Sequence, residues 1–524
     1  MRWPSVAVVS TVLVGCSLLY NPSNLPSPGD AHIPDADPCA LALGDVGPAV
    51  IEEGQGDGGS LPALVVLRGE NLVNSNLQVA LAAVSGTVHL EPVTDAIASA
   101  DHRFVAFTVT AHVDKALGTA GAVDVPLSVT VSQDAGAAAG MCVSVASRTD
   151  LLRLRALPEL TASSRPEVSG ATVTAQALQP RYSMVDLSGV GSVATFANDG
   201  SAAGSAPAIL SVVSSITLPD VNADAVGPRA GPGGKQGGST AGAGAGSGGA
   251  GSPAQTTGTG GGGGGAGAAL DGGSGADGNG VGGSAGQHLV DDTISSVEIG
   301  APSSGGGGGK GALNGGAAGG SGGGGGGVVV LAAGGDITAG MISAGGGGGA
   351  QGGTATLGLV GSGGGGGAGA GGIVVVESDT GTLKVTKINV KGNVGGPPGG
   401  GGTAGHGGSS SVGRVRWDAL GGTPPSSPDR APHRGPVFMV PSRVFRSLPQ
   451  TLTLLGTRDD VFTVRVTDHD HVVHDGGRAS FDQTSTAQIT PPLSPGYNRI
   501  CITLASGSQG RVEADKCIDV AVVR

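Results

Sequence analysis

Short apolar runs separated by polar turns fill a long stretch near the beginning of the chain. Apolar side chains dominate residues 64–67, 104–109 and 125–131, and glycine, proline, asparagine and aspartate fill much of the chain between them. Short runs at this spacing, bounded by turn residues, are typical of antiparallel strands in a sandwich of about 100 residues. We therefore predict a β-sandwich domain over residues 39–160.

The same pattern returns near the C-terminus. Apolar residues alternate with polar ones in residues 452–454, 461–466, 499–504 and 517–522. This pattern predicts a second β-sandwich over residues 442–524. Residues 421–441 carry six prolines and predict a linker in front of it.

A repeat lies between the two predicted sandwiches. Its three copies begin at Ala208, Val328 and Ile373, and each copy starts with an apolar strand. Seven residues separate the first anchor from the second, and five more lead to the third. The anchor sets are Ile209, Ile216 and Val221; Val330, Ile337 and Ile342; and Val376, Leu383 and Ile388. Equal intervals predict strands that stack in layers, as in a solenoid, with residues 161–230 as its strand-rich beginning. Residues 412–420 form a shortened last copy.

Glycine dominates residues 231–420, where runs of five or six glycines recur, and the whole chain contains 105 glycines. We consider two interpretations of these tracts. They could be disordered linkers, because glycine loses the most entropy on ordering. They could instead be polyproline II-type helices that pack backbone against backbone with N–H···O and Cα–H···O bonds. We prefer the second, because linkers rarely separate stacked copies of a rigid unit.

The composition narrows the fold class and the partners. Only 2% of the residues are aromatic and 13% are charged, so one continuous hydrophobic core is not expected. We predict an all-β protein in which two immunoglobulin-like β-sandwiches flank the glycine-rich β-repeat. The net charge of −12 is spread thinly, without the clustered lysines and arginines that nucleic-acid binding needs. We therefore expect no nucleic-acid partner.

The N-terminus resembles a bacterial lipoprotein signal. Arg2 precedes an apolar run, and Leu13-Val14-Gly15-Cys16 matches the lipobox pattern Leu-x-Gly-Cys. The resemblance implies cleavage after Gly15, a lipid on Cys16 and a membrane partner. Residues 1–15 would be the signal peptide and residues 16–38 a proline-containing tether. Because Ser17 rather than aspartate follows Cys16, we expect the chain to be anchored in the outer membrane of a bacterial cell envelope. The sequence does not decide between the periplasmic face and the cell surface.

Two further resemblances concern the domains. The segment "LVVLRGENL" from Leu64 looks like the early strand and turn of immunoglobulin-like modules of the IPT/TIG type. Residues 219–420 look like the glycine-rich domain of anaplastic lymphoma kinase-type receptors, because glycine runs alternate with short strands. That resemblance implies packed glycine helices that support ligand binding.

Four cysteines remain besides Cys16, an even number in an exported and oxidising context. Three pairings are possible. We prefer the local one, which joins Cys39 to Cys142 and Cys501 to Cys517, with one bridge in each flanking domain.

The densest polar cluster spans residues 468–475 and contains His469, His471 and His474. Imidazoles and carboxylates are metal ligands, and His469 and His471 would share one face of a strand. Gly476 and Gly477 follow, so we prefer an exposed hairpin tip to a metal site. We expect no cofactor and find no Ser/His/Asp or Cys/His set for catalysis.

These observations favour a non-catalytic, lipid-anchored envelope protein with a structural or adhesive role and an unidentified glycan or protein ligand. The alternative is a carbohydrate-active β-solenoid enzyme or a glycan-binding module.

Overall fold

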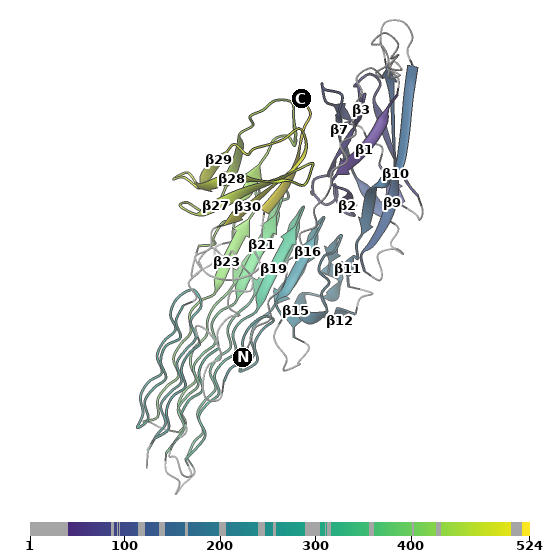
Figure 1. The fold of residues 1–524 in the computed structure, drawn as a ribbon. Coiled ribbons are helices and arrows are strands. Elements are labelled where there is room, and N and C mark those ends of the chain that lie inside the picture. The colour runs from purple at the N-terminus through teal and green to yellow at the C-terminus, as the bar shows by residue number, and fades with distance from the viewer. Residues whose placement is uncertain are drawn as a thin grey trace, which may run out of the picture.

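The protein is built from strands and glycine-rich segments, and its all-β class is as predicted (Figure 1). The computed structural model describes residues 40–84, 88–91, 93, 95–113, 121–135, 142–162, 166–198, 206–238, 247–254, 258–288, 304–309, 311, 316–355, 361–400, 403–425, 431–504 and 516–524. The predicted signal peptide and tether, with Cys16 and Cys39, lie outside these residues. The only described helices are two short 3₁₀ turns, η2 (Ala175–Ala177) and η3 (Ser188–Val190).

The N-terminal domain is a sandwich of two four-stranded sheets. One sheet has the order β1 (Ala42–Gly47), β3 (Ala63–Glu70), β7 (Phe104–Val109) and β6 (Ile97–Ala98). The other has the order β2 (Val50–Glu52), β10 (Cys142–Ala156), β9 (Val123–Ala135) and β4 (Gln78–Ala83). A small pair, β5 (Val88–Leu90) and β8 (Ala111–Val113), completes the domain. The alternation predicted for β9 is present, since Val125, Leu127, Val129 and Val131 are buried.

A parallel β-solenoid follows, as the repeat predicted. One of its sheets has the order β16 (Ala208–Val212), β19 (Val328–Ala333), β21 (Ile373–Ser378) and β23 (Arg414–Asp418). The other is nine-stranded and contains β11 (Leu160–Thr161), β12 (Val168–Ser169), β13 (Thr172–Thr174), β14 (Val185–Asp186), β15 (Val193–Ala197), β17 (Ile216–Leu218), β18 (Asp220–Asn222), β20 (Ile337–Ser343) and β22 (Leu383–Asn389).

The register of the solenoid matches the predicted anchors at all positions but one. Ile216 pairs with Ile337, which pairs with Leu383, and Ile342 lies between Val221 and Ile388. Val330 pairs with Ile209 on one side, but with Val375 rather than the predicted Val376 on the other. The turn between β21 and β22 is one residue longer than the turn between β19 and β20, which shifts the third copy.

Inward-facing residues form ladders through the solenoid core. The largest ladder runs from Leu210 through Leu331 and Val376 to Trp417, one residue from each successive strand. All four are buried in one cluster with the anchor residues of the nine-stranded sheet. The stack is longer than the repeat alone showed, because β14 pairs in parallel with β17 and β15 with β18.

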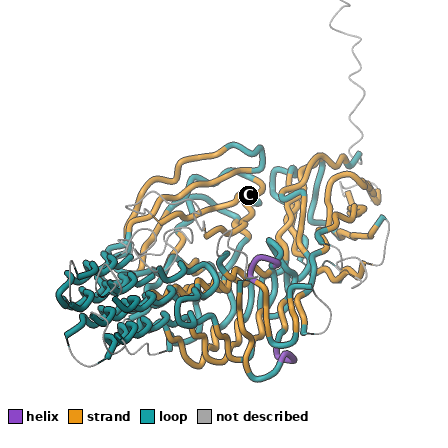
Figure 2. Tube along the Cα trace, turned by 90° about the horizontal axis from the view of Figure 1, so that it is seen from below, coloured by secondary structure: helices purple, strands orange, loops and turns teal. Residues whose placement is uncertain are grey.

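The glycine tracts between the coils form an ordered bundle. Its rods run side by side and project from the solenoid, away from the two sandwiches (Figures 1 and 2). Residues 361–372 lie at its centre and lead directly into β21. Their backbone N–H groups donate in rotation to three different neighbours, and the same neighbour returns at every third residue. Gly363, Gly366 and Gly369 donate to Gly353, Ala350 and Gly347; Gly364 and Gly367 to Gly309 and Gly306; Gly365 and Ala368 to Gly405 and Gly408.

The carbonyl groups of residues 361–370 accept bonds from three further segments. The donors belong to residues 317–326, residues 260–266 and residues 396–399. The segment is therefore surrounded by six others through backbone hydrogen bonds alone. Three residues per turn is the period of a polyproline II helix, so these are the packed glycine helices that we preferred at the sequence level. Residues 258–268 have six hydrogen-bonded neighbours in the same way.

Close backbone contacts explain why glycine dominates the central segments. A Cβ atom on Gly366 would lie 1.9 Å from the carbonyl oxygen of Ser321, and one on Gly264 would lie 1.9 Å from that of Ser284. Segments at the surface of the bundle differ. Thr403, His406 and Ser409 are exposed at every third position, and a Cβ on Gly348 would meet no atom closer than 3.7 Å.

The C-terminal domain is the second predicted sandwich. Its sheets have the orders β24 (Val437–Met439), β26 (Leu452–Leu455), β29 (Thr486–Ile489), and β25 (Val444–Phe445), β31 (Lys516–Val522), β30 (Gly496–Leu504), β27 (Val461–Asp468), β28 (Val473–Ser480). The sandwich begins earlier than predicted, because β24 lies within the expected linker 421–441 and pairs with β26.

Candidate functional site

The two sandwiches contact each other directly through the outer face of β3. Leu64 and Val66 on this face are buried with Phe104, and with Tyr497 and Ala521 of the C-terminal domain. Val65 and Leu67 face the core of their own domain. The unbroken apolar run at residues 64–67 therefore marks a strand that is buried on both faces.

His469 belongs to this contact. Its Nε2 atom lies 3.0 Å from Oδ1 of Asp45, and its ring meets Phe104 edge-on. Arg68 also forms an ion pair with Asp45 at 3.3 Å. Burial would raise the pKa of the Asp45 carboxyl, but the hydrogen bond and charge of His469, together with Arg68, outweigh it and lower that pKa. The contact thus favours the ionised carboxylate.

The predicted histidine cluster lies at a hairpin turn, as we preferred, but only part of it is exposed. His469 and His471 lie in the turn between β27 and β28, not on one strand face, because β27 ends at Asp468. His471 is exposed and has a φ of 61°, whereas His469 is buried. His474 lies 2.7 Å from Asp468. Within the described ranges, no three His, Cys, Asp or Glu side chains are grouped as a metal ion would require.

Charged side chains gather where the last coil of the solenoid meets the C-terminal domain. Arg416 and Asp418 of β23 are both buried and form an ion pair of 2.6 Å. Lys516, the first residue of β31, lies 2.6 Å from Asp379 in the turn after β21. Burial alone would lower the pKa of the Lys516 ammonium, but Asp379 and Glu377 outweigh it and raise the pKa. Burial raises the pKa of the Glu377 carboxyl despite the nearby Lys516 and Arg416.

A cavity of about 270 Å³ opens beside this cluster, at the junction of all three domains. Gln55 and Ser60 line it from the N-terminal sandwich. Arg181, Asp379 and Thr380 line it from the solenoid, and the C-terminal sandwich contributes residues including Arg443, Lys516 and Asp519. Three cationic side chains thus face two carboxylates around one space. Concave sites at domain junctions with converging polar groups are typical of ligand-binding pockets.

Arg443 differs from the other charged residues of the cavity. Arg181 lies 2.9 Å from Glu52, and Lys516 pairs with Asp379. The Arg443 guanidinium donates a hydrogen bond of 2.6 Å to the backbone carbonyl of Pro62, and no carboxylate of the described chain forms an ion pair with it. Burial lowers its pKa, and the charge of Asp519 offsets this only in part. The cavity is therefore lined by a half-buried cation with spare donors.

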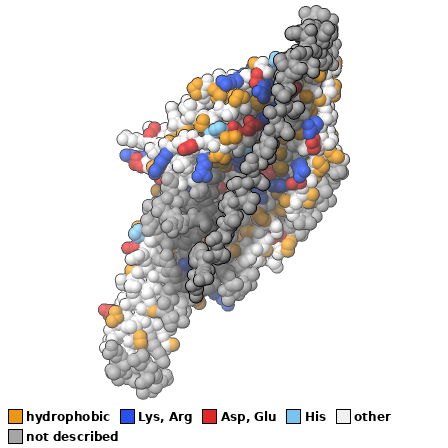
Figure 3. Space-filling view, in the orientation of Figure 1, with side chains coloured by type: hydrophobic (Ala, Val, Ile, Leu, Met, Phe, Trp, Pro, Cys, Tyr) orange, Lys and Arg blue, Asp and Glu red, His pale blue; other side chains and the backbone are white. Residues whose placement is uncertain are grey.

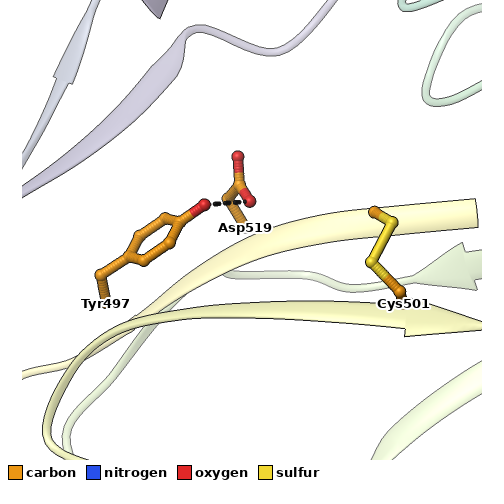
Figure 4. The surroundings of a disulfide bond; sticks show 4 residues. Tyr497, Cys501 and Asp519 are labelled. Atoms are coloured by element: carbon orange, nitrogen blue, oxygen red, sulfur yellow. Dashed lines mark hydrogen bonds between the residues drawn. A yellow bond between two sulfur atoms is a disulfide. The ribbon is translucent and has the colours of Figure 1, made fainter. Parts of the chain in front are cut away.

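A disulfide lies next to the cavity. Cys501 of β30 and Cys517 of β31 are opposite each other in the sheet and are joined, in the pairing that we preferred. Nearby, the hydroxyl of Tyr497 donates a hydrogen bond of 2.6 Å to Asp519 (Figure 4). Burial and the charge of Asp519 raise the pKa of Tyr497. Cys142 lies at the start of β10, but its predicted partner Cys39 is outside the described residues, so that pairing stays a prediction.

Sequence reasoning did not identify the cavity. Arg181, Asp379, Arg443 and Lys516 are isolated in sequence and follow no motif. One signal was present, namely Glu377 near the end of the apolar strand β21 and the charged residues Arg416 and Asp418 within β23. Charges inside a strand pattern indicate contact with another domain or a ligand.

Comparison with known proteins gave no match to a family model, a curated protein or a solved structure. None of the helices in the described part of the chain has the length and apolar character to cross a membrane.

Proposed function

We propose that this chain is a non-catalytic, lipid-anchored protein of a bacterial cell envelope, in which the glycine bundle is a stiff projecting element with a structural or adhesive role. The bundle is the observation that carries this proposal. Two of its segments have six hydrogen-bonded neighbours each, and it extends away from the three β-domains (Figure 1).

The surface of the bundle supports a scaffold or contact role. The charged side chains visible in Figure 3 gather mainly over the sandwiches, whereas the bundle shows few of them. Many of its exposed positions carry small or polar residues such as Thr403, Ser409, Ser274 and Ser284, and it also exposes the apolar side chains of Leu270, Val281 and Val394. A backbone-bonded rod of this kind holds its shape without a hydrophobic core, so it can hold a contact surface at a distance from the anchor.

The anchor rests on the lipobox at Leu13 to Cys16. The test is metabolic labelling with radioactive palmitate of bacterial cells that express the full chain. We expect the chain to carry label and to sediment with membranes, and we expect Cys16→Ala to abolish both. Cys39→Ala is the matched control, because it also removes one cysteine near the N-terminus and should keep the label.

Label that persists in the Cys16→Ala chain would overturn the anchoring. The face of the membrane is decided by protease treatment of whole cells. Cleavage of the chain in intact cells places the bundle at the cell surface, and protection places it in the periplasm.

A further inference from the structure

We propose that the cavity at the junction of the three domains binds a small organic carboxylate of the size and polarity of a hexuronic acid, held by the guanidinium of Arg443. The cavity and the position of Arg443 carry this proposal. It does not depend on how the chain is anchored or on the role of the glycine bundle.

The charge argument comes from the pairing of the lining residues. Arg181 and Lys516 each have a carboxylate partner within 2.9 Å, whereas Arg443 uses one donor on the carbonyl of Pro62 and forms no ion pair with a carboxylate in the described ranges. A guanidinium has five N–H donors in a planar fork that matches a carboxylate. Arg443 is half-buried, and the nearby Asp519 acts on it only through its charge, so a carboxylate in the cavity would supply the direct partner that the guanidinium lacks.

The size and lining select the rest of the ligand. A volume of about 270 Å³ holds about nine water molecules, which is comparable to one sugar-sized molecule. Gln55, Ser60 and Thr380 add amide and hydroxyl groups at the wall, and Phe438 and Val440 add apolar surface. Hydroxyl groups on the ligand would find partners at the polar wall, and its ring would lie against the apolar wall.

The position of the cavity predicts a second effect of binding. Ser60, Thr380 and Arg443 come from three different domains, so a ligand that touches all three would tighten the junction. Anything that binds the folded arrangement and not the unfolded chain raises its stability. The ligand should therefore raise the melting temperature as well as bind.

The test is titration calorimetry with the purified full-length chain and D-galacturonate, with D-galactose as the neutral probe of the same shape. We expect galacturonate to bind and to raise the melting temperature, and galactose to do neither. Arg443→Gln should weaken galacturonate binding by about 10- to 100-fold, the usual loss when a charged hydrogen bond is removed. Arg465→Gln, which removes an exposed arginine of β27, should bind like the original chain.

Arg443→Gln also removes the bond to Pro62, so a second variant separates binding from domain contact. Leu420→Trp narrows the cavity and leaves every charged residue in place. It should weaken galacturonate binding as well. The proposal is wrong if galacturonate fails to bind, if galactose binds equally well, or if both variants bind galacturonate like the original chain.

Discussion

The glycine bundle and the solenoid that carries it are consecutive in the chain but are held together in opposite ways. Residues 361–372 lead into β21 without a break, and the main neighbours of the strand remain neighbours of the segment before it. In the solenoid, side chains such as Leu331 and Trp417 fill a buried core. In the centre of the bundle, most contacts are made by backbone atoms, and the main exception is a small cluster of the buried side chains of Ala266, Ala268 and Ala370.

The difference shows what each region requires of its sequence. The solenoid needs apolar volume, because its stability comes from area removed from water, about 25 cal/mol per Å². The bundle needs residues without side chains, because its N–H and C=O groups reach their partners only where no Cβ atom intervenes. Each backbone hydrogen bond contributes about 0.5–1.5 kcal/mol net, and ordering glycine is costly in entropy, so the bundle depends on saturating both groups of nearly every central residue.

Removing side-chain volume from the core of the solenoid should cause the largest loss of stability. Leu331→Ala deletes the middle of the ladder from Leu210 to Trp417 and leaves a cavity, so we expect a loss of about 2–5 kcal/mol in the free energy of unfolding. Urea denaturation followed by circular dichroism measures it. Ile209→Ala, on the opposite face of the same sheet, removes a side chain that is 37% exposed and should cost less than about 1 kcal/mol. Equal losses in both variants would contradict the side-chain account of the solenoid.

Adding side-chain volume to the bundle should change its stability by a smaller amount. The position decides whether the change destabilises or stabilises the bundle. Gly366→Ala places a Cβ 1.9 Å from a carbonyl oxygen, and forcing the backbones apart should cost about 1–3 kcal/mol. Gly348→Ala places its Cβ in ordinary contact with Asn393, at 3.7 Å, and should stabilise by about 0.4–1 kcal/mol, because alanine restricts the unfolded chain. Hydrogen exchange of bundle peptides, read by mass spectrometry, measures both. Similar exchange in the two variants would show that the bundle is not packed as described.

The smallest effect should come from acid, which should loosen the contact between the two sandwiches but not the glycine bundle. The lowered pKa values of Asp45 and Asp468 mean that their contribution to stability is present above the unfolded pKa, near 4, and is lost as pH falls through the folded values. Below about pH 4 the contact between the sandwiches should loosen, whereas the centre of the bundle, which has no titratable side chain, should keep its amide protection. Exchange at pH 6 and pH 3, corrected for intrinsic rates, tests this. Equal loosening in both regions would contradict it.

Much of the fold could be predicted because the geometry of both regions determines local sequence patterns, namely the spacing of apolar residues in the solenoid and the glycine runs in the bundle. The intervals between Ile209, Ile216 and Val221 are set by the strands and turns of one coil, so the interval of five residues recurs in all three copies and the interval of seven in two of them. The third copy was misaligned by one residue because Ile373 to Val376 are all apolar, and a uniform run does not show which residue faces inward. The start of the C-terminal domain was missed because prolines and turn residues surround the short β24.

The cavity could not be predicted, for a physical reason. Arg443 and Lys516 come together with Asp379 and Ser60 only after three domains dock, and docking depends on surfaces rather than on local periodicity. The same holds for His469, whose partner Asp45 lies in the other sandwich.

The exposed residues at every third position of the outer glycine segments have a consequence for assembly. A hexagonal array of identical rods has no natural boundary, and each rod at its rim offers a template for the next, as the face of a growing crystal does. Thr403, His406 and Ser409 carry exposed side chains on one such outer segment. Their side chains therefore keep a further glycine segment, such as one from a second molecule, from packing against this face. The bundle is thereby limited to the segments of a single chain.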